Sequence, residues 1–100
     1  MKIHAIEEAV AFADGKANKV ALAGGEHCRT TLWCLEPGQE IHPHAHAGDH
    51  VWVVHGGSGW FLSGGEAHPV GVGSVVFAPA GEIHGMRAES RLIFVSVSAG

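Results

Sequence analysis

The sequence predicts an all-β domain of antiparallel strands, closed into a small barrel. Short runs rich in Val, Leu, Thr, Trp and Phe alternate with glycine-containing breaks along most of the chain. Strands at such regular, short spacing are typical of a sandwich or a barrel. The chain also contains 15 glycines in 100 residues, which fits tight hairpins because these turns need positive φ. A chain of this length is expected to form one domain, residues 1–100, with a thin core.

One short helix is expected before the strands. Apolar residues recur at intervals of three and four residues, at Ile3, Ile6, Val10 and Ala13. This is the spacing of one helix face, and Asp14-Gly15 ends it. We therefore expect a helix near residues 5–13 that packs on the outside of the sheet, and no second helix after it.

Six apolar runs are expected to form strands. Each is rich in β-branched, aromatic or other apolar residues. They are Lys19–Ala23, Cys28–Leu35, Val51–His55, Trp60–Leu62, Ser74–Phe77 and Leu92–Val97. The breaks between them include Pro37-Gly38, Gly56-Gly57 and Pro79-Ala80-Gly81, which are turn signals.

The composition excludes some partners and suggests others. The formal net charge is −4, with only six Lys and Arg in total, so a basic surface for nucleic acid cannot form. No segment approaches the roughly 20 apolar residues that span a membrane, and no signal-peptide pattern opens the chain, so a cytoplasmic location is expected. Charged residues make up only 16% of the chain, which favours a homodimer that covers apolar surface.

Two cysteines, Cys28 and Cys34, lie in one apolar run. On one strand they would point the same way but lie too far apart for a disulfide. We expect free, buried thiols, and a role as soft metal ligands is the alternative.

The nine histidines are the unusual feature of the composition, because five of them lie between His42 and His55. His44 and His46 would share one face of a strand, with Cα atoms roughly 6.5–7 Å apart. The turn Ala47-Gly48-Asp49 would then bring His50 beside them. His84, which comes after another turn, is the best fourth candidate.

These four histidines, His44, His46, His50 and His84, are predicted to bind one divalent transition-metal ion. Neutral imidazole suits Zn, Cu, Fe and Ni, and Mn is also possible, whereas Ca and Mg prefer oxygen ligands. The other interpretation of each histidine is an ordinary hydrogen-bonded residue. That interpretation is preferred for His4, His27, His55 and His68, and also for His42, although His42 shares strand parity with His44.

The spacing of these residues resembles the two motifs of the cupin family. Gly38-x5-His44-x-His46-x3-His50-x6-Gly57 is similar to the first motif, and Gly73-x5-Pro79-x-Gly81-x2-His84 is similar to the second. The resemblance to small RmlC-like cupins implies an antiparallel double-stranded β-helix, the cupin jelly-roll barrel. It also implies a metal held by His44, His46, His50 and His84. His50 stands where cupins usually have glutamate, and Ala88 stands where the second motif usually ends in asparagine.

This resemblance implies two classes of function. The first is a metal-dependent enzyme acting on a small organic molecule inside the barrel, of dioxygenase type or an isomerase or lyase. The alternative is a non-catalytic cupin that binds a metal or a small ligand, for example as a sensor. No catalytic residue is assigned, because Glu40, Asp49 and Glu82 are interpreted as surface carboxylates or as hydrogen-bond partners of imidazoles.

Apolar and aromatic side chains are expected to line the mouth of the barrel. The candidates are Trp33, Trp52, Trp60, Phe61, Phe77, Ile83 and Met86. Trp52 is the best of them, because it comes two residues after His50 on the same strand. A small molecule bound among these side chains would lie next to the metal.

Overall fold

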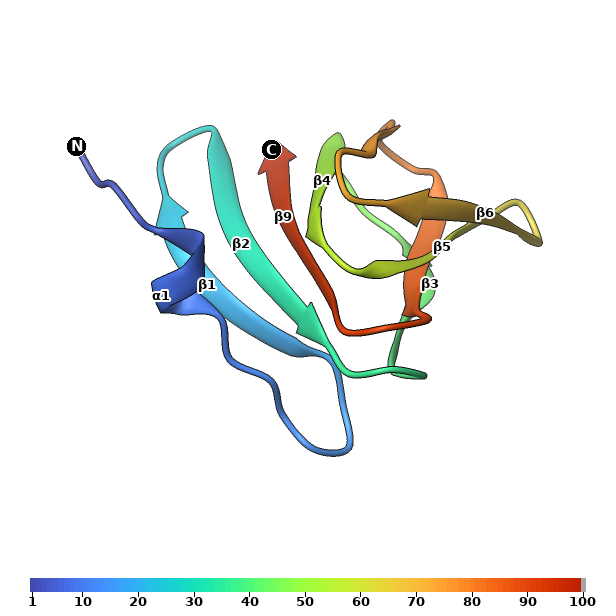
Figure 1. Cartoon of the computed structure of the whole chain (residues 1–100). Coiled ribbons are helices and arrows are strands. Elements are labelled where there is room, and N and C mark those ends of the chain that lie inside the picture. Colours follow the sequence, from blue (N-terminus) through green and yellow to red (C-terminus); the bar gives the residue numbers. More distant parts are fainter. Residues whose placement is uncertain (100) are drawn as a thin grey trace.

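The computed structural model describes residues 1–99, and in them nine strands form two antiparallel sheets (Figure 1). The five-stranded sheet has, in order, β1 (Asn18–Gly24), β2 (Cys28–Leu35), β9 (Leu92–Ala99), β4 (His50–Gly56) and β7 (Val75–Ala78). The four-stranded sheet has β3 (Glu40–Ala45), β8 (Ile83–Ala88), β5 (Ser58–Ser63) and β6 (Glu66–Gly71). The prediction of an all-β antiparallel fold is confirmed.

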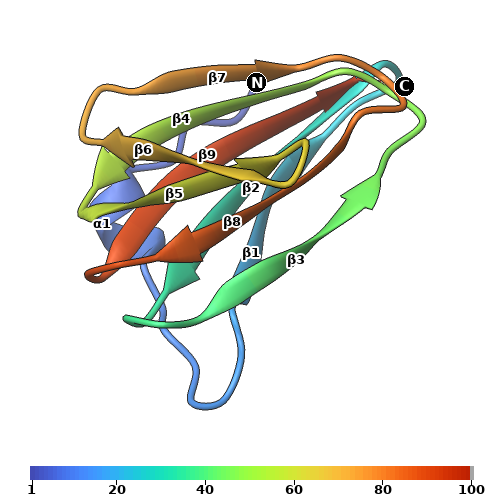
Figure 2. The same ribbon diagram turned by 90° about the vertical axis from the view of Figure 1, so that its right-hand side faces the viewer.

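The two sheets enclose one core. Many paired strands are distant in sequence, since β9 pairs with β2 and β4, and β8 pairs with β3 and β5. Figure 2 shows how this arrangement curves the sheets toward each other. The buried side chains between them include Trp52, Phe61, Met86, Leu92 and Phe94. Burial of these large apolar groups is the main stabilising contribution expected for a domain of this size.

The helix is shorter than the sequence predicts. α1 spans only Ile6–Ala9, and at Val10 the backbone turns away from helical geometry, with ψ 126°. The backbone carbonyl of Ala11 accepts a hydrogen bond from Asn18 Nδ2 (2.7 Å), and that of Ala13 accepts one from Gln39 Nε2 (2.8 Å). These tertiary contacts hold residues 11–13 in a non-helical conformation, so the helix ends before residue 13 although the local pattern favours it.

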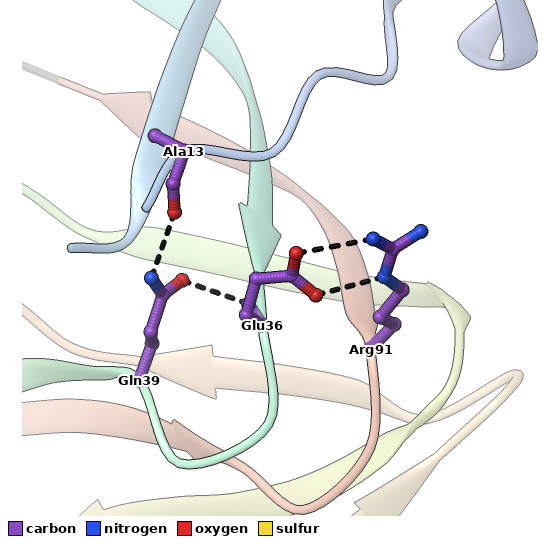
Figure 3. Close-up of polar contacts among 4 residues, drawn as sticks. All are labelled: Ala13, Glu36, Gln39 and Arg91. Carbon is purple, nitrogen blue, oxygen red and sulfur yellow. Dashed lines mark hydrogen bonds and ion pairs between the residues drawn. The ribbon is translucent and has the colours of Figure 1, made fainter. Parts of the chain in front are cut away.

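A polar cluster holds the segment after α1 against the end of the barrel (Figure 3). Arg91 Nε donates to Glu36 Oε1 (2.8 Å) and its terminal nitrogen donates to Glu36 Oε2 (3.1 Å). The same guanidinium lies 4.5 Å from the ring centroid of Phe12. Earlier in the chain, Glu7 Oε1 lies 3.8 Å from His55 Nε2, which places α1 beside the end of β4.

Three strands lie outside the six runs that the sequence analysis identified: β3, β6 and β8. β6 is an edge strand that contains Pro69, and most of its residues are exposed, so it has no apolar signal to detect. β8 is mostly buried but carries Gly85 and Arg87, which interrupt its apolar pattern. Two of these three strands, β3 and β8, carry or adjoin the histidines that the sequence analysis singled out as candidate ligands.

The pairing of β3 with β8 contains a β-bulge. Ile41 pairs with Met86 and His44 pairs with His84. The chain thus advances three residues along β3 but only two along β8, so β3 contains one extra residue. The bulged backbone lies directly over Gly85. A Cβ atom at Gly85 would lie 2.8 Å from Pro43 N and closer still to the carbonyl oxygen of Ile41.

The cysteine prediction is partly wrong. Both thiols are free, as expected, and Cys34 is buried, but Cys28 is exposed. Cys28 is the first residue of β2, beyond the part of the strand that packs in the interior. Strand parity therefore predicts which way its side chain points but not whether anything covers it.

Within residues 1–99, no helix is long and apolar enough to cross a membrane.

The predicted homodimer stays a prediction, and one surface is suited to it. On the outer face of the five-stranded sheet, Val53 pairs with Val75 and Val51 with Phe77. Val75 and Phe77 are 66% and 61% exposed.

We predict that Gly85→Ala destabilises the protein by about 1–3 kcal/mol, because the added methyl group would collide with the bulged backbone of β3. Urea denaturation monitored by tryptophan fluorescence measures this change. Gly71→Ala is the matched control, since a Cβ there meets no atom within 4 Å, and it should change stability by no more than about 0.5 kcal/mol. Equal stability of the two variants would show that the bulge does not need glycine.

We also predict that a second copy of the chain covers the apolar face of β4 and β7. Phe77→Glu should therefore dissociate a dimer, because a buried, unpaired charge is costly. Ile83→Glu on the other sheet, where Ile83 is 59% exposed, should not. Sedimentation velocity measures both, and a wild-type species of 10.4 kDa at micromolar concentration would contradict the prediction.

Candidate metal centre

Three imidazoles converge at one end of the barrel. His46 comes directly after β3, His50 begins β4 and His84 lies in β8. One nitrogen from each of these rings lies within 4.8 Å of the others. The His46 ring centroid is 4.0 Å from that of His50 and 5.0 Å from that of His84. Such a group of three could hold a transition-metal ion.

His44 lies beside this trio and is not part of it. Its ring centroid is 4.2 Å from that of His46, and it pairs with His84 across the β3–β8 ladder. His44 is exposed, whereas His50 and His84 are buried. The structure therefore brings three of the four predicted ligands together and places the fourth next to them.

Two turns hold the histidines in place, and they are bonded to each other. Gly81 N donates to the carbonyl oxygen of His46 (2.8 Å), and Ala80 N donates to Asp49 Oδ1 (2.9 Å). The turn after β3 is thereby joined to the turn before β8. Gly81 has φ +85°, a conformation that strongly favours glycine. Two segments more than thirty residues apart thus meet at a defined distance.

The hydrogen bonds of the imidazoles determine which nitrogens are free. His84 Nδ1 donates to the carbonyl oxygen of Glu82 (3.0 Å), and His44 Nδ1 donates to the carbonyl oxygen of His42 (2.9 Å). Since a carbonyl can only accept, both rings carry their proton on Nδ1 when neutral, and Nε2 keeps its lone pair. His84 Nε2 is buried and has no hydrogen-bond partner among the described residues. Such an atom is costly to leave unpaired, and a metal ion would satisfy it.

The electrostatic environment favours the neutral form of His46 and His50. Burial, followed by the neighbouring His50, His44 and His84, lowers the pKa of His46 to about 4. Burial also lowers the pKa of His50, with smaller contributions from His84 and Arg29. Because a metal binds neutral imidazole, few protons need to be displaced near neutral pH. The donor set and its charge state therefore fit a transition-metal ion.

Two aromatic rings pack against the His84 imidazole. The Phe61 ring is stacked on it at 5.6 Å, and Trp52 meets it edge-on at 5.1 Å. Trp52 also lies on the same face as His50, as predicted, at 6.5 Å between centroids. These contacts restrict the rotation of the His84 ring, so its Nε2 is held in one direction.

A cavity of about 280 Å³ opens beside the histidines. Its lining residues come from both sheets: Lys19, Arg29, Thr31, Trp33, Ile41, His44, His46, His50, Trp52, Ser96 and Ser98. Sequence reasoning missed its polar wall, although Ser96 and Ser98 alternate with Val95 and Val97 along β9. That alternation is a usable signal, because successive residues of a strand face opposite sides.

Several predicted lining residues lie elsewhere, and these predictions are wrong. Phe77 and Ile83 are exposed on the outside, while Phe61 and Met86 belong to the core. Trp60 lies under the guanidinium of Arg87, 5.0 Å from its ring centroid. Of the seven candidates, Trp33 and Trp52 line the cavity. The other five were chosen for their apolar or aromatic character, which does not separate the core and the outer surface from the wall of a cavity.

The remaining histidines and the nearby carboxylates lie outside the centre. His42 Nδ1 lies 3.0 Å from Glu40 Oε2 on the surface, because the bulge turns it away from His44. His27, His55 and His68 are exposed as well. Asp49 Oδ1 accepts a hydrogen bond from Ala80 N, and Glu82 accepts one from Ser63 Oγ (2.7 Å). No carboxylate among the described residues lines the cavity, so none is in place as a general base.

Comparisons with known proteins agree with this description. The sequence matches the Cupin_2 family, described as a cupin domain, over residues 31–98. The TT1209 structure from Thermus thermophilus shares 30% identity, with a TM-score of 0.92 over 99% of this chain and 97% of that one. An RmlC-like cupin from Desulfovibrio desulfuricans gives the same identity and TM-score over 99% and 96% of the two chains.

A third similar structure is a conserved protein with a double-stranded β-helix domain from Klebsiella pneumoniae. It shares 26% identity, with a TM-score of 0.92 over 99% of this chain and 90% of that one. No curated protein matches the sequence.

We predict that the metal-free protein loses stability as the pH falls from about 6.5 toward 4. In this window the unfolded chain protonates histidines that the folded chain keeps neutral, since folding lowers the pKa of His46 to about 4 and also that of His50. Proton uptake on unfolding favours the unfolded state at low pH. The urea midpoint of chelator-treated protein should therefore be lower at pH 5 than at pH 7.5.

His46→Gln should weaken this pH dependence, and His68→Gln, which changes an exposed histidine, should not. A midpoint that stays constant or rises between pH 7.5 and pH 5 would contradict the prediction.

Proposed function

This chain belongs to the cupin domain family, and we propose that it is a metal-dependent enzyme acting on a small organic molecule in the cavity. One observation carries the proposal: His46, His50 and His84 converge beside a cavity, with His84 Nε2 buried and unpartnered. Buried polar atoms without hydrogen-bond partners are rare, and a free lone pair such as that of His84 Nε2 is available to a metal ion. The reaction class is dioxygenase-like, or an isomerase or lyase.

The proposed cofactor is one divalent ion of Mn, Fe, Ni, Zn or Cu, held by His44, His46, His50 and His84. His44 is included because its Nδ1 is tied to the carbonyl oxygen of His42, which leaves Nε2 free beside His46. His44 is also exposed, so it has room to rotate toward the ion. Imidazole suits each of these metals, and their availability decides among them.

When bound, the ion supplies a Lewis acid, and four neutral ligands leave its positive charge uncompensated. The chain's own residues set the surroundings. Trp52 and Ile41 present apolar surface to the cavity, which limits water beside the reacting molecule. The hydrogen bonds from His84 and His44 to backbone carbonyls keep both rings in the tautomer that binds metal. The alternative is that the same site binds a metal and a small ligand without catalysing a reaction. We also propose a cytoplasmic location for the protein.

We predict that His46→Ala and His84→Ala each lower metal affinity at least about 100-fold, because even partners of metal ligands contribute 10–100-fold. His50→Glu should retain the metal, since carboxylate is also a ligand, while reducing its effective charge. His68→Ala is the control and should bind as wild type does. Elemental analysis and competition with a chelator measure these affinities. If His50→Ala binds metal as tightly as wild type, the assigned ligand set is wrong.

Activity is tested after the bound metal is identified by elemental analysis. Oxygen consumption and substrate loss are measured with β-diketones, enols and organic acids, using wild type and His84→Ala. Turnover that requires the metal and is lost in His84→Ala supports an enzyme. Metal and ligand binding without turnover of any candidate supports the non-catalytic alternative.

A further inference from the structure

One wall of the cavity is more polar and more cationic than a barrel interior requires. It is formed by the inward faces of β1, β2 and β9, and the strand register defines its rows. Arg29 pairs with Ser98, and Ser98 pairs with His50. In the next row Thr31 pairs with Ser96, which pairs with Trp52. Inward positions of packed sheets are normally apolar, so a buried Ser96 at 4% exposure calls for a reason.

Arg29 lies within reach of the metal centre. It is on the same row as His50, with β9 between them, so their Cα atoms are about 10 Å apart at two strand spacings. An extended arginine side chain covers most of that distance. Lys19 lies further along the same wall, where it pairs with Trp33, and its Nζ is 5.9 Å from the Trp33 ring centroid. Both cations line the cavity together with His50.

Neither of these two cations has a carboxylate partner among residues 1–99. Within residues 1–99, no carboxylate lies within 4.0 Å of Lys19 Nζ or of the Arg29 guanidinium. The other two arginines are paired, Arg87 with Glu40 (3.9 Å) and Arg91 with Glu36 (2.8 Å). In a chain of net charge −4, two cations without a carboxylate partner among residues 1–99 make this cavity a region of positive potential, because the neutral imidazoles beside them carry no compensating charge. Such a region attracts anions.

Hydroxyl groups add donors to the same wall. Ser96 Oγ accepts a hydrogen bond from Trp33 Nε1 (3.2 Å), which leaves its own O–H free to donate. Ser98 and Thr31 also line the cavity and carry hydroxyl groups. A carboxylate accepts several such bonds, and guanidinium binds it through two parallel ones.

We propose that Arg29 and Lys19, with Ser96 and Ser98, form an anion subsite facing the histidines, and that the substrate is a small carboxylate. This inference rests on the proposed function, because the other end of the molecule is taken to present an oxygen to the metal ion. A neutral diketone or sugar would leave both cations unpaired. The cavity volume of about 280 Å³ restricts the substrate to a small acid, since pockets for drug-sized molecules reach up to roughly 1,000 Å³.

The experiment measures binding with a redox-inert metal, so it needs no turnover. Zinc is added first, and zinc affinity is measured by calorimetry for wild type, Arg29→Gln, Arg29→Lys, Lys19→Gln and Lys16→Gln. Malonate and its neutral counterpart malonamide are then titrated into each zinc-loaded protein. Lys16→Gln is the matched control, because it removes the same charge from an exposed lysine outside the cavity lining. Arg29 and Lys19 are exposed as well, so their variants should fold and bind zinc.

The expected result is that wild type binds malonate more tightly than malonamide. Arg29→Gln should weaken malonate binding about 10-fold or more, since hydrogen bonds to charged groups are the strong ones. Lys19→Gln should weaken it less, and Arg29→Lys should restore part of the loss. Malonamide affinity should be unaffected in every variant, as should malonate affinity in Lys16→Gln.

Each other outcome overturns a defined part of the proposal. If zinc binds but malonate binds Arg29→Gln and wild type equally, or binds no better than malonamide, the anion subsite is wrong and the metal centre stands. If zinc does not bind wild type, the proposed function fails, and the subsite inference fails with it.

Discussion

Gly85 lies so close to the backbone of β3 that no side chain fits between the two strands. This close approach permits the bulge at residues 42–43, and the bulge sets the register of the rest of β3. Beyond the bulge, His44 pairs with His84, and the next residues reach the turn that leads to His50. That turn is bonded to the turn before β8 through Gly81 and His46. The convergence of the imidazoles thus depends on contacts between backbones, in which the imidazole rings take no part.

Much of the centre could be predicted from the sequence because its information is local. The spacing of His44, His46 and His50 around a three-residue turn already indicates that the three side chains lie on the same face of adjacent strands. Turn residues before His84 mark the point at which the chain comes back toward them. The bulge could not be predicted in this way. It reverses the parity of His42 relative to His44, and it depends on Gly85, which is more than forty residues away in the sequence. Period-two reasoning fails wherever an extra residue enters a ladder.

The other differences between sequence and structure have related physical causes. The apolar spacing predicts a helix that reaches residue 13, but hydrogen bonds from the side chains of Asn18 and Gln39 hold the segment around Ala11–Ala13 in a non-helical conformation. No local pattern reveals such long-range partners. β6 escapes prediction because an exposed edge strand has no apolar side to detect. The lining of the cavity is misassigned because sequence patterns separate apolar from polar residues. They do not separate the core from the wall of a cavity.

The electrostatics of the cavity connects its two halves. Burial and mutual repulsion keep His46 and His50 neutral, and Arg29 opposes any added positive charge near His50. The same repulsion would act against a divalent cation at the proposed site, so without an anion this site would bind metal less tightly than four imidazoles alone. A bound anion reverses that effect, because its charge offsets both Arg29 and the ion. Coupling between two ligands is reciprocal. The factor by which a bound anion would raise the affinity for the metal is therefore the factor by which the metal would raise the affinity for the anion. If the two proposals hold, neutral ligands on one wall and two cations on the other would therefore favour metal and anion bound together over either one alone.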